Sequence, residues 1–150
     1  MDASETVDRD VRLCVYRRFL KDGRPPSALD VADELGLSLE ETEGSFRRLE
    51  AGHVLVFLPG TLDVWMANPL SAVPTGFWVE TPHGDYWGSC VWDAFGVVAM
   101  LGGDGTVSTS CPDCDEPMEL RVESWELQPS DGVAHFSVPA RRWWDDIGFT

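Results

Sequence analysis

Apolar and polar positions follow a helical period in the first third of the chain. Between residues 8 and 20, apolar side chains recur every three or four positions, which predicts an amphipathic helix. They are Val11, Val15, Phe19 and Leu20. Ser27 and Ser38 each precede another apolar pattern and are followed, three positions later, by an acidic residue, a spacing typical of helix N-caps. The pattern predicts three helices, then a strand and turn over residues 52–60.

The pattern changes to that of a sheet from residue 61 onward. Six short segments are alternating or aromatic-rich, as strands are. They are residues 62–66, 77–80, 86–87, 106–110, 118–124 and 133–138. Cys90 to Leu101 is the one segment here with a helical pattern, and Gly102-Gly103 ends it. The predicted fold class is α+β: a three-helix, winged-helix-like unit (residues 1–60) packed on a mixed β-sheet domain (residues 61–150) with a helix following Cys90.

Charge argues against the function that a winged helix first suggests, which is DNA binding. The formal net charge is −15, and residues 59–150 hold three basic against fourteen acidic side chains. The third predicted helix, in the position of a recognition helix, begins with Glu40, Glu41 and Glu43, which would repel phosphate. We therefore expect no nucleic-acid partner, and a structural or docking role for this unit.

The apolar runs also bear on where the protein works. None approaches the roughly 20 residues that span a bilayer, and the acidic N-terminus does not have the layout of a signal peptide. We expect no membrane partner and a cytoplasmic protein. Four cysteines in such a chain indicate thiols or metal ligands rather than disulfides. Cys14 lies within the first apolar pattern and is predicted to be a core residue.

The segment Gly88–Gly96 places a thiol and a carboxylate at the start of a predicted helix. Unpaired backbone N–H groups and the helix dipole at that end would favour the Cys90 thiolate. Asp93 is one turn further on and reaches the same region. A thiol nucleophile or soft-metal ligand beside a proton-carrying carboxylate is a workable catalytic pair. The alternative is a buried cysteine followed by a helix-capping aspartate.

A second cysteine group, Cys111-Pro112-Asp113-Cys114, lies between two predicted strands. This C-x-x-C spacing suits zinc or another thiophilic metal. A structural zinc site needs two further ligands, however, and the three histidines (His53, His83 and His135) are scattered singly. We interpret each histidine as a surface or core residue. The alternative for the cysteines is a turn whose side chains pack against the core.

These segments together resemble the organomercurial (alkylmercury) lyase family. The similarity lies in residues 68–75, 88–96, 110–112 and 143–150, in consistent order, and in the preceding helical unit, so that it covers about residues 10–150. Each segment alone would be a weak signal. Cys-x-x-Asp-Ala-x-Gly in this context is specific.

The resemblance implies a reaction that cleaves a carbon–mercury bond. Family members use two cysteines and an aspartate: one thiolate captures the organomercurial, the second completes a dithiolate around Hg(II), and the aspartate protonates the leaving carbon. By position, Cys90 is the capturing thiol and Asp93 the proton carrier, while Cys111 matches a cysteine regarded as structural. No cofactor is required, Hg(II) is the bound product, and the expected partners are an organometallic substrate and small thiols or a metal-accepting protein that remove the product.

One departure from the family pattern leaves alternatives open. The second catalytic cysteine of the family follows directly after the segment matching Gly148-Phe149-Thr150, and Thr150 is the last residue here. Either the sequence is a shortened form, or it is a relative without that thiol and with impaired activity, or Cys114 replaces it. A further alternative is a non-enzymatic thiol protein that binds Hg, Cu or Zn ions through Cys90, Cys111 and Cys114. Oligomeric state does not follow from the sequence.

Overall fold

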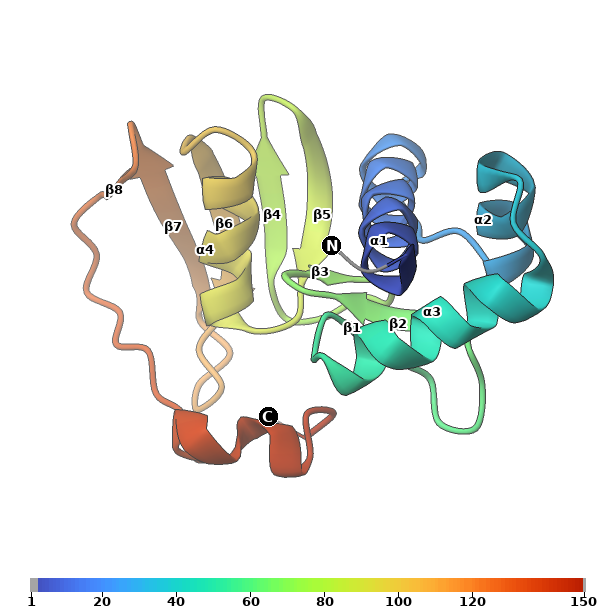
Figure 1. Cartoon of the computed structure of the whole chain (residues 1–150). Coiled ribbons are helices and arrows are strands. Elements are labelled where there is room, and N and C mark those ends of the chain that lie inside the picture. Colours follow the sequence, from blue (N-terminus) through green and yellow to red (C-terminus); the bar gives the residue numbers. More distant parts are fainter. Residues whose placement is uncertain (1–2, 150) are drawn as a thin grey trace.

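Three helices lead into an eight-stranded sheet in the computed structural model, which describes residues 3–149 (Figure 1). Helices α1 (Ala3–Asp22), α2 (Ala28–Leu35) and α3 (Leu39–Ala51) confirm the helices predicted for the first third. Capping boxes begin α2 and α3: the Asp30 N–H donates to Ser27 Oγ at 3.1 Å, and the Glu41 N–H to Ser38 Oγ at 3.2 Å. Local hydrogen bonds therefore fix where these helices start.

The sheet has the strand order β1-β2-β3-β5-β4-β6-β7-β8, and every neighbouring pair is antiparallel. The strands are β1 (Leu55–Phe57), β2 (Val64–Ala67), β3 (Leu70–Ser71), β4 (Trp78–Thr81), β5 (Gly84–Gly88), β6 (Gly105–Ser110), β7 (Pro117–Glu123) and β8 (Glu126–Leu127). The prediction of a mixed sheet is therefore wrong. Most connections are too short for parallel neighbours, which require a long crossover.

The one long crossover contains helix α4 (Val91–Met100), as predicted for the segment after Cys90. It joins β5 to β6, and because β4 lies between these two strands, each still pairs antiparallel with its neighbour. Helix α4 contacts β3, β4, β5 and β6, and thus covers one face of the sheet (Figure 1). The first turn of α4 is consequently held where β5 ends.

One cluster of buried side chains runs through both halves of the molecule. It includes Val15 and Phe46 of the helices, Leu70 and Val79 of the sheet, and Val97 of α4. Cys14 belongs to it and is fully buried, which confirms the expected core position. The predicted domain boundary at residue 60 falls in the turn between β1 and β2, which pair with each other. The two predicted domains thus share one core.

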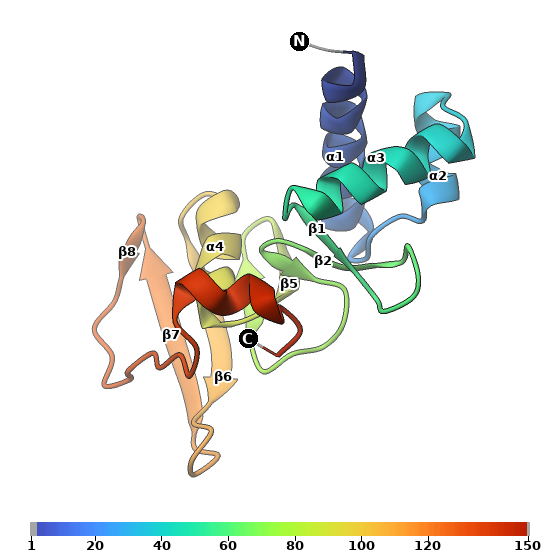
Figure 2. The same cartoon turned by 60° about the horizontal axis from the view of Figure 1, so that its bottom comes forward.

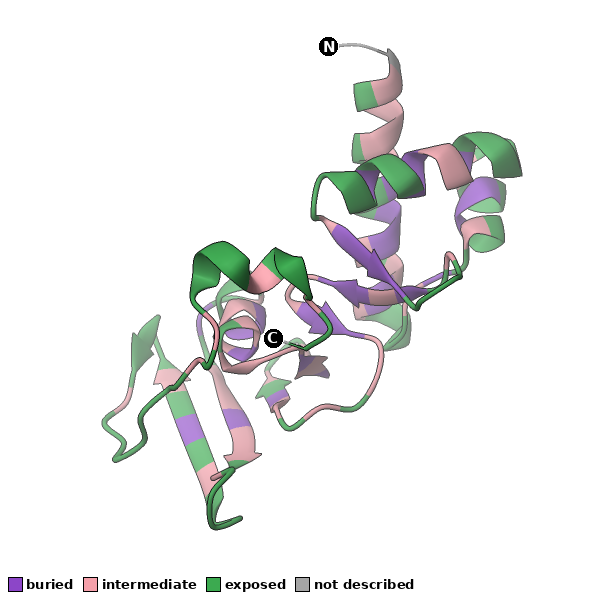
Figure 3. Cartoon of the chain, turned by 90° about the horizontal axis from the view of Figure 1, so that it is seen from below, coloured by how far each residue is buried: buried purple, intermediate pink, exposed green. Residues whose placement is uncertain are grey.

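The C-terminal segment differs from its prediction. Residues 133–138 do not form a strand; the last strand is β8, and the chain then runs without strand to a 3-10 helix, η1 (Ala140–Asp145). The alternation at residues 133–138 misled because it does not correspond to a buried face: Val133 is 90% exposed. Figure 3 shows how little of this segment is buried compared with α1, β1 and β2.

None of the helices in the described part of the chain has the length and apolar character needed to cross a membrane.

Candidate active site at the start of helix α4

Close packing of Gly88 brings Cys90 into the site. A Cβ atom on Gly88, the last residue of β5, would lie 2.7 Å from the backbone of Ala94, so only glycine lets the first turn of α4 approach the strand this closely. The carbonyl of Gly88 accepts a hydrogen bond from Thr75 Oγ1 at 2.6 Å. Cys90 then takes the N-cap position in extended conformation, and its side chain makes no capping hydrogen bond. The thiol is thus left to interact elsewhere.

The Cys90 thiol donates to the Asp93 carboxylate, with Sγ and Oδ2 3.5 Å apart. Burial raises the pKa of the Cys90 thiol and outweighs the backbone N–H groups of Asp93 and Trp92, which lower it. The helix N-terminus therefore acts in the expected direction, but burial outweighs it, so the pKa of Cys90 lies above its ordinary value and not below it as the sequence predicts. Burial likewise raises the pKa of Asp93, although the hydrogen bond from Cys90 opposes the rise.

A pocket of about 420 Å³ surrounds this pair. Its lining combines the start of α4 with β2, the turn after α3 and the C-terminal segment: His53, Met66, Asn68, Ser89, Cys90, Trp92, Asp93, Phe136, Trp143, Trp144, Ile147, Gly148 and Phe149. Aromatic side chains dominate, while Asp93 is the one carboxylate among them. The pocket thus combines aromatic surface with polar groups that could orient a small molecule.

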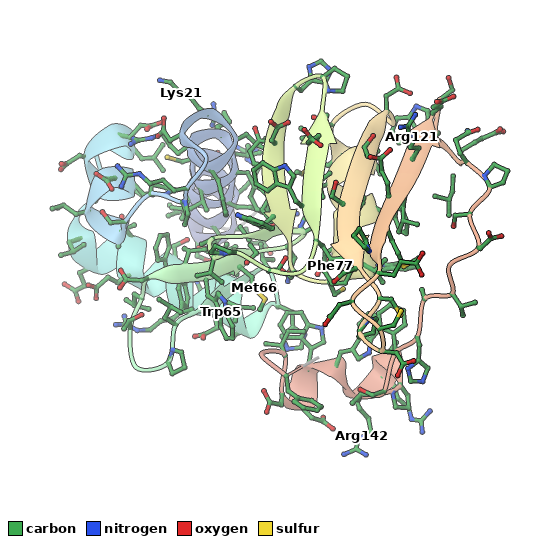
Figure 4. All side chains as sticks on the ribbon, turned by 180° about the vertical axis from the view of Figure 1, so that it is seen from behind. Lys21, Trp65, Met66, Phe77, Arg121 and Arg142 are labelled. Carbon is green, nitrogen blue, oxygen red and sulfur yellow. The ribbon has the colours of Figure 1, made fainter. Side chains whose placement is uncertain are left out.

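The C-terminal segment forms one wall of the pocket. The Trp144 ring stacks on His53, with centroids 3.9 Å apart and planes 6° from parallel. A Cβ on Gly148 would come within 2.8 Å of the Trp65 ring, so this glycine also packs closely. Figure 2 shows η1 beside the start of α4, and Figure 4 shows Trp65 and Met66 on the side of the sheet toward that segment, with Arg142 projecting away.

Sequence reasoning missed most of this wall. The sequence predicts a surface or core position for His53; the residue is exposed, and it also lines the pocket. Its partner Trp144 is 91 positions away in the numbering of the chain, so no local pattern connects the two. The available signals are the family resemblance of residues 143–150 and the two adjacent tryptophans in that tail, which are unusual for a surface segment.

Helix α1 reaches the pocket through Tyr16. Its hydroxyl donates to the backbone carbonyl of Asn68, a pocket residue, at 2.6 Å. Burial raises the pKa of Tyr16, and the nearby charge of Asp93 adds to the rise while that of Arg12 opposes it. The helical part of the molecule therefore supports the site directly, by holding the loop between β2 and β3.

The other two predicted ligands, Cys111 and Cys114, do not line this pocket. They lie in the turn between β6 and β7, where Cys111 is half-buried and Cys114 is exposed. The backbone N–H groups of Asp113 and Cys114, and then the Cys114 thiol, hydrogen-bond to the Cys111 sulfur and lower its pKa. Residues 3–149 contain no group of three or more His, Cys, Asp or Glu side chains arranged to hold a metal ion.

Comparison with known proteins places these features in context. The sequence model described as "MerB: Alkylmercury lyase" matches residues 70–150, which is more than half of the chain and includes Cys90, Asp93 and the C-terminal wall. A solved structure, the mercury-bound form of MerB2, is similar with a TM-score of 0.63 at 15% sequence identity. That likeness covers 81% of this chain and 60% of the MerB2 chain, and shows the fold. No curated protein sequence matches.

Proposed function

This chain belongs to the alkylmercury lyase family, and from that premise we propose that it cleaves a carbon–mercury bond with Cys90 as the capturing thiol and Asp93 as the proton carrier. The observation that carries the proposal is the contact of 3.5 Å between Cys90 Sγ and Asp93 Oδ2 inside an aromatic pocket. A thiol that already donates to a carboxylate has a defined acceptor for its proton at the moment when a soft metal takes the sulfur.

Capture of the substrate is the first step. The Cys90 sulfur bonds to the mercury of R–Hg–X, the anion X⁻ leaves, and the thiol proton passes to the Asp93 carboxylate. The raised pKa of the buried thiol is no obstacle to this step, because mercury displaces the proton as it binds. The product of the step is a Cys90–S–Hg–R adduct beside a neutral Asp93 carboxylic acid.

Cleavage is the second step. A second thiolate joins the mercury and raises electron density on the bound carbon, and Asp93 delivers its proton to that carbon. The hydrocarbon R–H leaves, mercury remains as a dithiolate, and Asp93 is again a carboxylate. Burial, which raises the pKa of Asp93, favours the protonated form on which this transfer depends. A small thiol from solution supplies the second thiolate in this proposal, and further thiol exchange releases Hg(II).

Benzene release from phenylmercury in the presence of excess glutathione tests the proposal. We expect turnover in the native chain and a loss of roughly 10³-fold or more in Cys90→Ser, since the metal-binding atom is removed. Asp93→Asn should still take up phenylmercury but release little benzene, because an amide does not carry the proton. Cys14→Ala is the matched control: it removes a thiol that is fully buried in the core.

The same assay separates the enzyme from a thiol protein that only binds soft metals. Stoichiometric uptake of mercury by the native chain without any benzene would favour the binding protein. Turnover that survives Cys90→Ser would contradict the assignment of Cys90. If turnover instead depends on Cys114, the alternative that this thiol joins Cys90 at the metal gains support.

A further inference from the structure

The turn between β6 and β7 holds its two cysteines in one defined arrangement. The Cys111 N–H donates to the Glu116 carbonyl at 2.9 Å, and the Asp115 N–H donates to the Cys111 carbonyl at 2.9 Å. Asp115 adopts a left-handed conformation with φ of 58°, which reverses the chain. Because β6 and β7 pair along their whole length up to Ser110 and Pro117, the turn is anchored at both ends. The backbone that carries the two cysteines is therefore fixed at both ends.

Both cysteines lie within this one turn, three positions apart, and the hydrogen bond from the Asp115 N–H to the Cys111 carbonyl closes the turn around them. Cys114 is exposed and Cys111 half-buried, so an ion can reach both from solvent. The acidic neighbours Asp113, Asp115 and Glu116 give the turn a negative charge that attracts cations.

The number of ligands limits which cation fits. Zinc in structural sites takes four ligands, and although acidic residues lie in the turn, the described residues contain no group of three or more His, Cys, Asp or Glu side chains arranged to hold a metal ion. Soft ions that are satisfied by two thiolates are the remaining class. We propose that Cys111 and Cys114 form a second mercury site, separate from the Cys90 pocket, which chelates inorganic Hg(II) as a bis-thiolate.

Formation of the site is a ligand exchange. Hg(II) held by two small thiols bonds to the Cys111 and Cys114 sulfurs, and the two protein protons pass to the departing small thiolates. No electron is transferred. An organomercurial R–Hg–X has one of its two strong bonds occupied by carbon, so one sulfur completes the preferred two-coordinate form and the second sulfur adds only a weak third bond. The turn should therefore select the inorganic ion, which is the product of the reaction if the proposed lyase function holds.

The experiment uses HgCl₂ with millimolar glutathione as competitor, so that mercury on a single thiol is removed and chelated mercury is retained. Cys90→Ser serves as the background, since it removes the pocket thiol. We expect the Cys90→Ser variant to retain one Hg(II). Cys90→Ser/Cys114→Ser should retain Hg(II) roughly 10²-fold more weakly, because it loses the affinity gained from a second linked ligand. Cys90→Ser/Cys14→Ala is the control and should match the background.

Phenylmercury and Zn(II) are the comparison probes. Cys90→Ser and Cys90→Ser/Cys114→Ser should differ by no more than about twofold in their affinity for phenylmercury, because chelation adds little there. Neither variant should retain Zn(II). Equal retention of Hg(II) with and without Cys114 would overturn the proposal. Sedimentation that finds Hg(II) only in dimers would also overturn it, because the ion would then bridge two chains. These outcomes do not depend on benzene release, so failure of the lyase assay leaves this test intact.

Discussion

Two thiol environments in this molecule respond to the same backbone chemistry with opposite results. Backbone N–H groups act to lower the pKa of both Cys90 and Cys111. At Cys90 burial dominates and the pKa rises, whereas at Cys111 the N–H groups and the Cys114 thiol dominate and the pKa falls. The difference is that one thiol lies inside an aromatic pocket and the other in a surface turn.

This comparison shows what a helix N-terminus can and cannot do. Aligned N–H groups stabilise a thiolate, but loss of water from the same sulfur costs more when the surroundings are apolar. A protonated thiol beside Asp93 suits a reaction in which the thiol proton is used later. A more acidic thiol in an exposed pair suits rapid exchange of a metal ion with solvent thiols.

The largest expected contrast is in alkylation by iodoacetamide, followed for each cysteine by mass spectrometry across pH. Cys111 should react with a midpoint below the ordinary cysteine pKa and Cys90 with a midpoint above it. At neutral pH we expect Cys111 to react at least about tenfold faster, because the thiolate is the reacting form. In denaturant the two rates should converge. A lower midpoint for Cys90 would show that the helix end outweighs burial after all.

An intermediate effect is expected when the wall of the pocket is removed. Trp144→Ala breaks the stack on His53 and opens the pocket. A lost aromatic contact of about 1 kcal/mol corresponds to a roughly fivefold higher KM for phenylmercury. The kcat should change less, since Trp144 is not placed at the reacting atoms.

Trp125→Ala is the matched control for this change. Trp125, in the turn between β7 and β8, is also a large exposed aromatic residue, but it packs on Gly103 after α4 and does not line the pocket. The KM of Trp125→Ala for phenylmercury should stay within about twofold of the native value, because the substitution removes no contact in the pocket. An equal rise of KM in both variants would mean that general loosening, rather than the wall, explains the result.

The smallest effect is on stability and depends on pH. Because burial raises the pKa of Asp93, the folded state binds its proton more tightly than the unfolded state does. The native chain therefore loses stability as pH rises from the unfolded pKa of Asp93 through the folded one. Asp93→Asn lacks this loss and should therefore be more stable than the native chain at neutral pH.

Denaturant unfolding at several pH values measures this difference. The advantage of Asp93→Asn should shrink to nothing in acid, where the native carboxyl is also neutral. Asp104→Asn provides a contrast. The native Asp104 carboxylate is exposed and accepts a hydrogen bond from the Ser124 N–H at 2.6 Å, so its replacement should not increase stability. A constant advantage at every pH would point to packing or hydrogen bonding instead of charge.

Prediction from the sequence succeeded where one short stretch of chain decides the outcome. The two serine caps with their acidic partners marked where α2 and α3 begin, and the core position of Cys14 followed from its helical neighbours. Prediction failed at residues 133–138, where the alternating side chains are not buried and no strand forms. The prediction of a mixed sheet was also wrong, because all neighbouring strands are antiparallel. Pairing partners depend on segments far apart, which a local pattern does not contain.

The same division holds at the site. The sequence by itself determined that Cys90 and Asp93 lie one helical turn apart, because their spacing and the helix that carries them are local properties. Only the tertiary structure decided that Trp144 stacks on His53 across the pocket and that burial reverses the expected shift of the Cys90 pKa. Both depend on which distant side chains exclude water from one sulfur, and solvent exclusion is a property of the folded molecule.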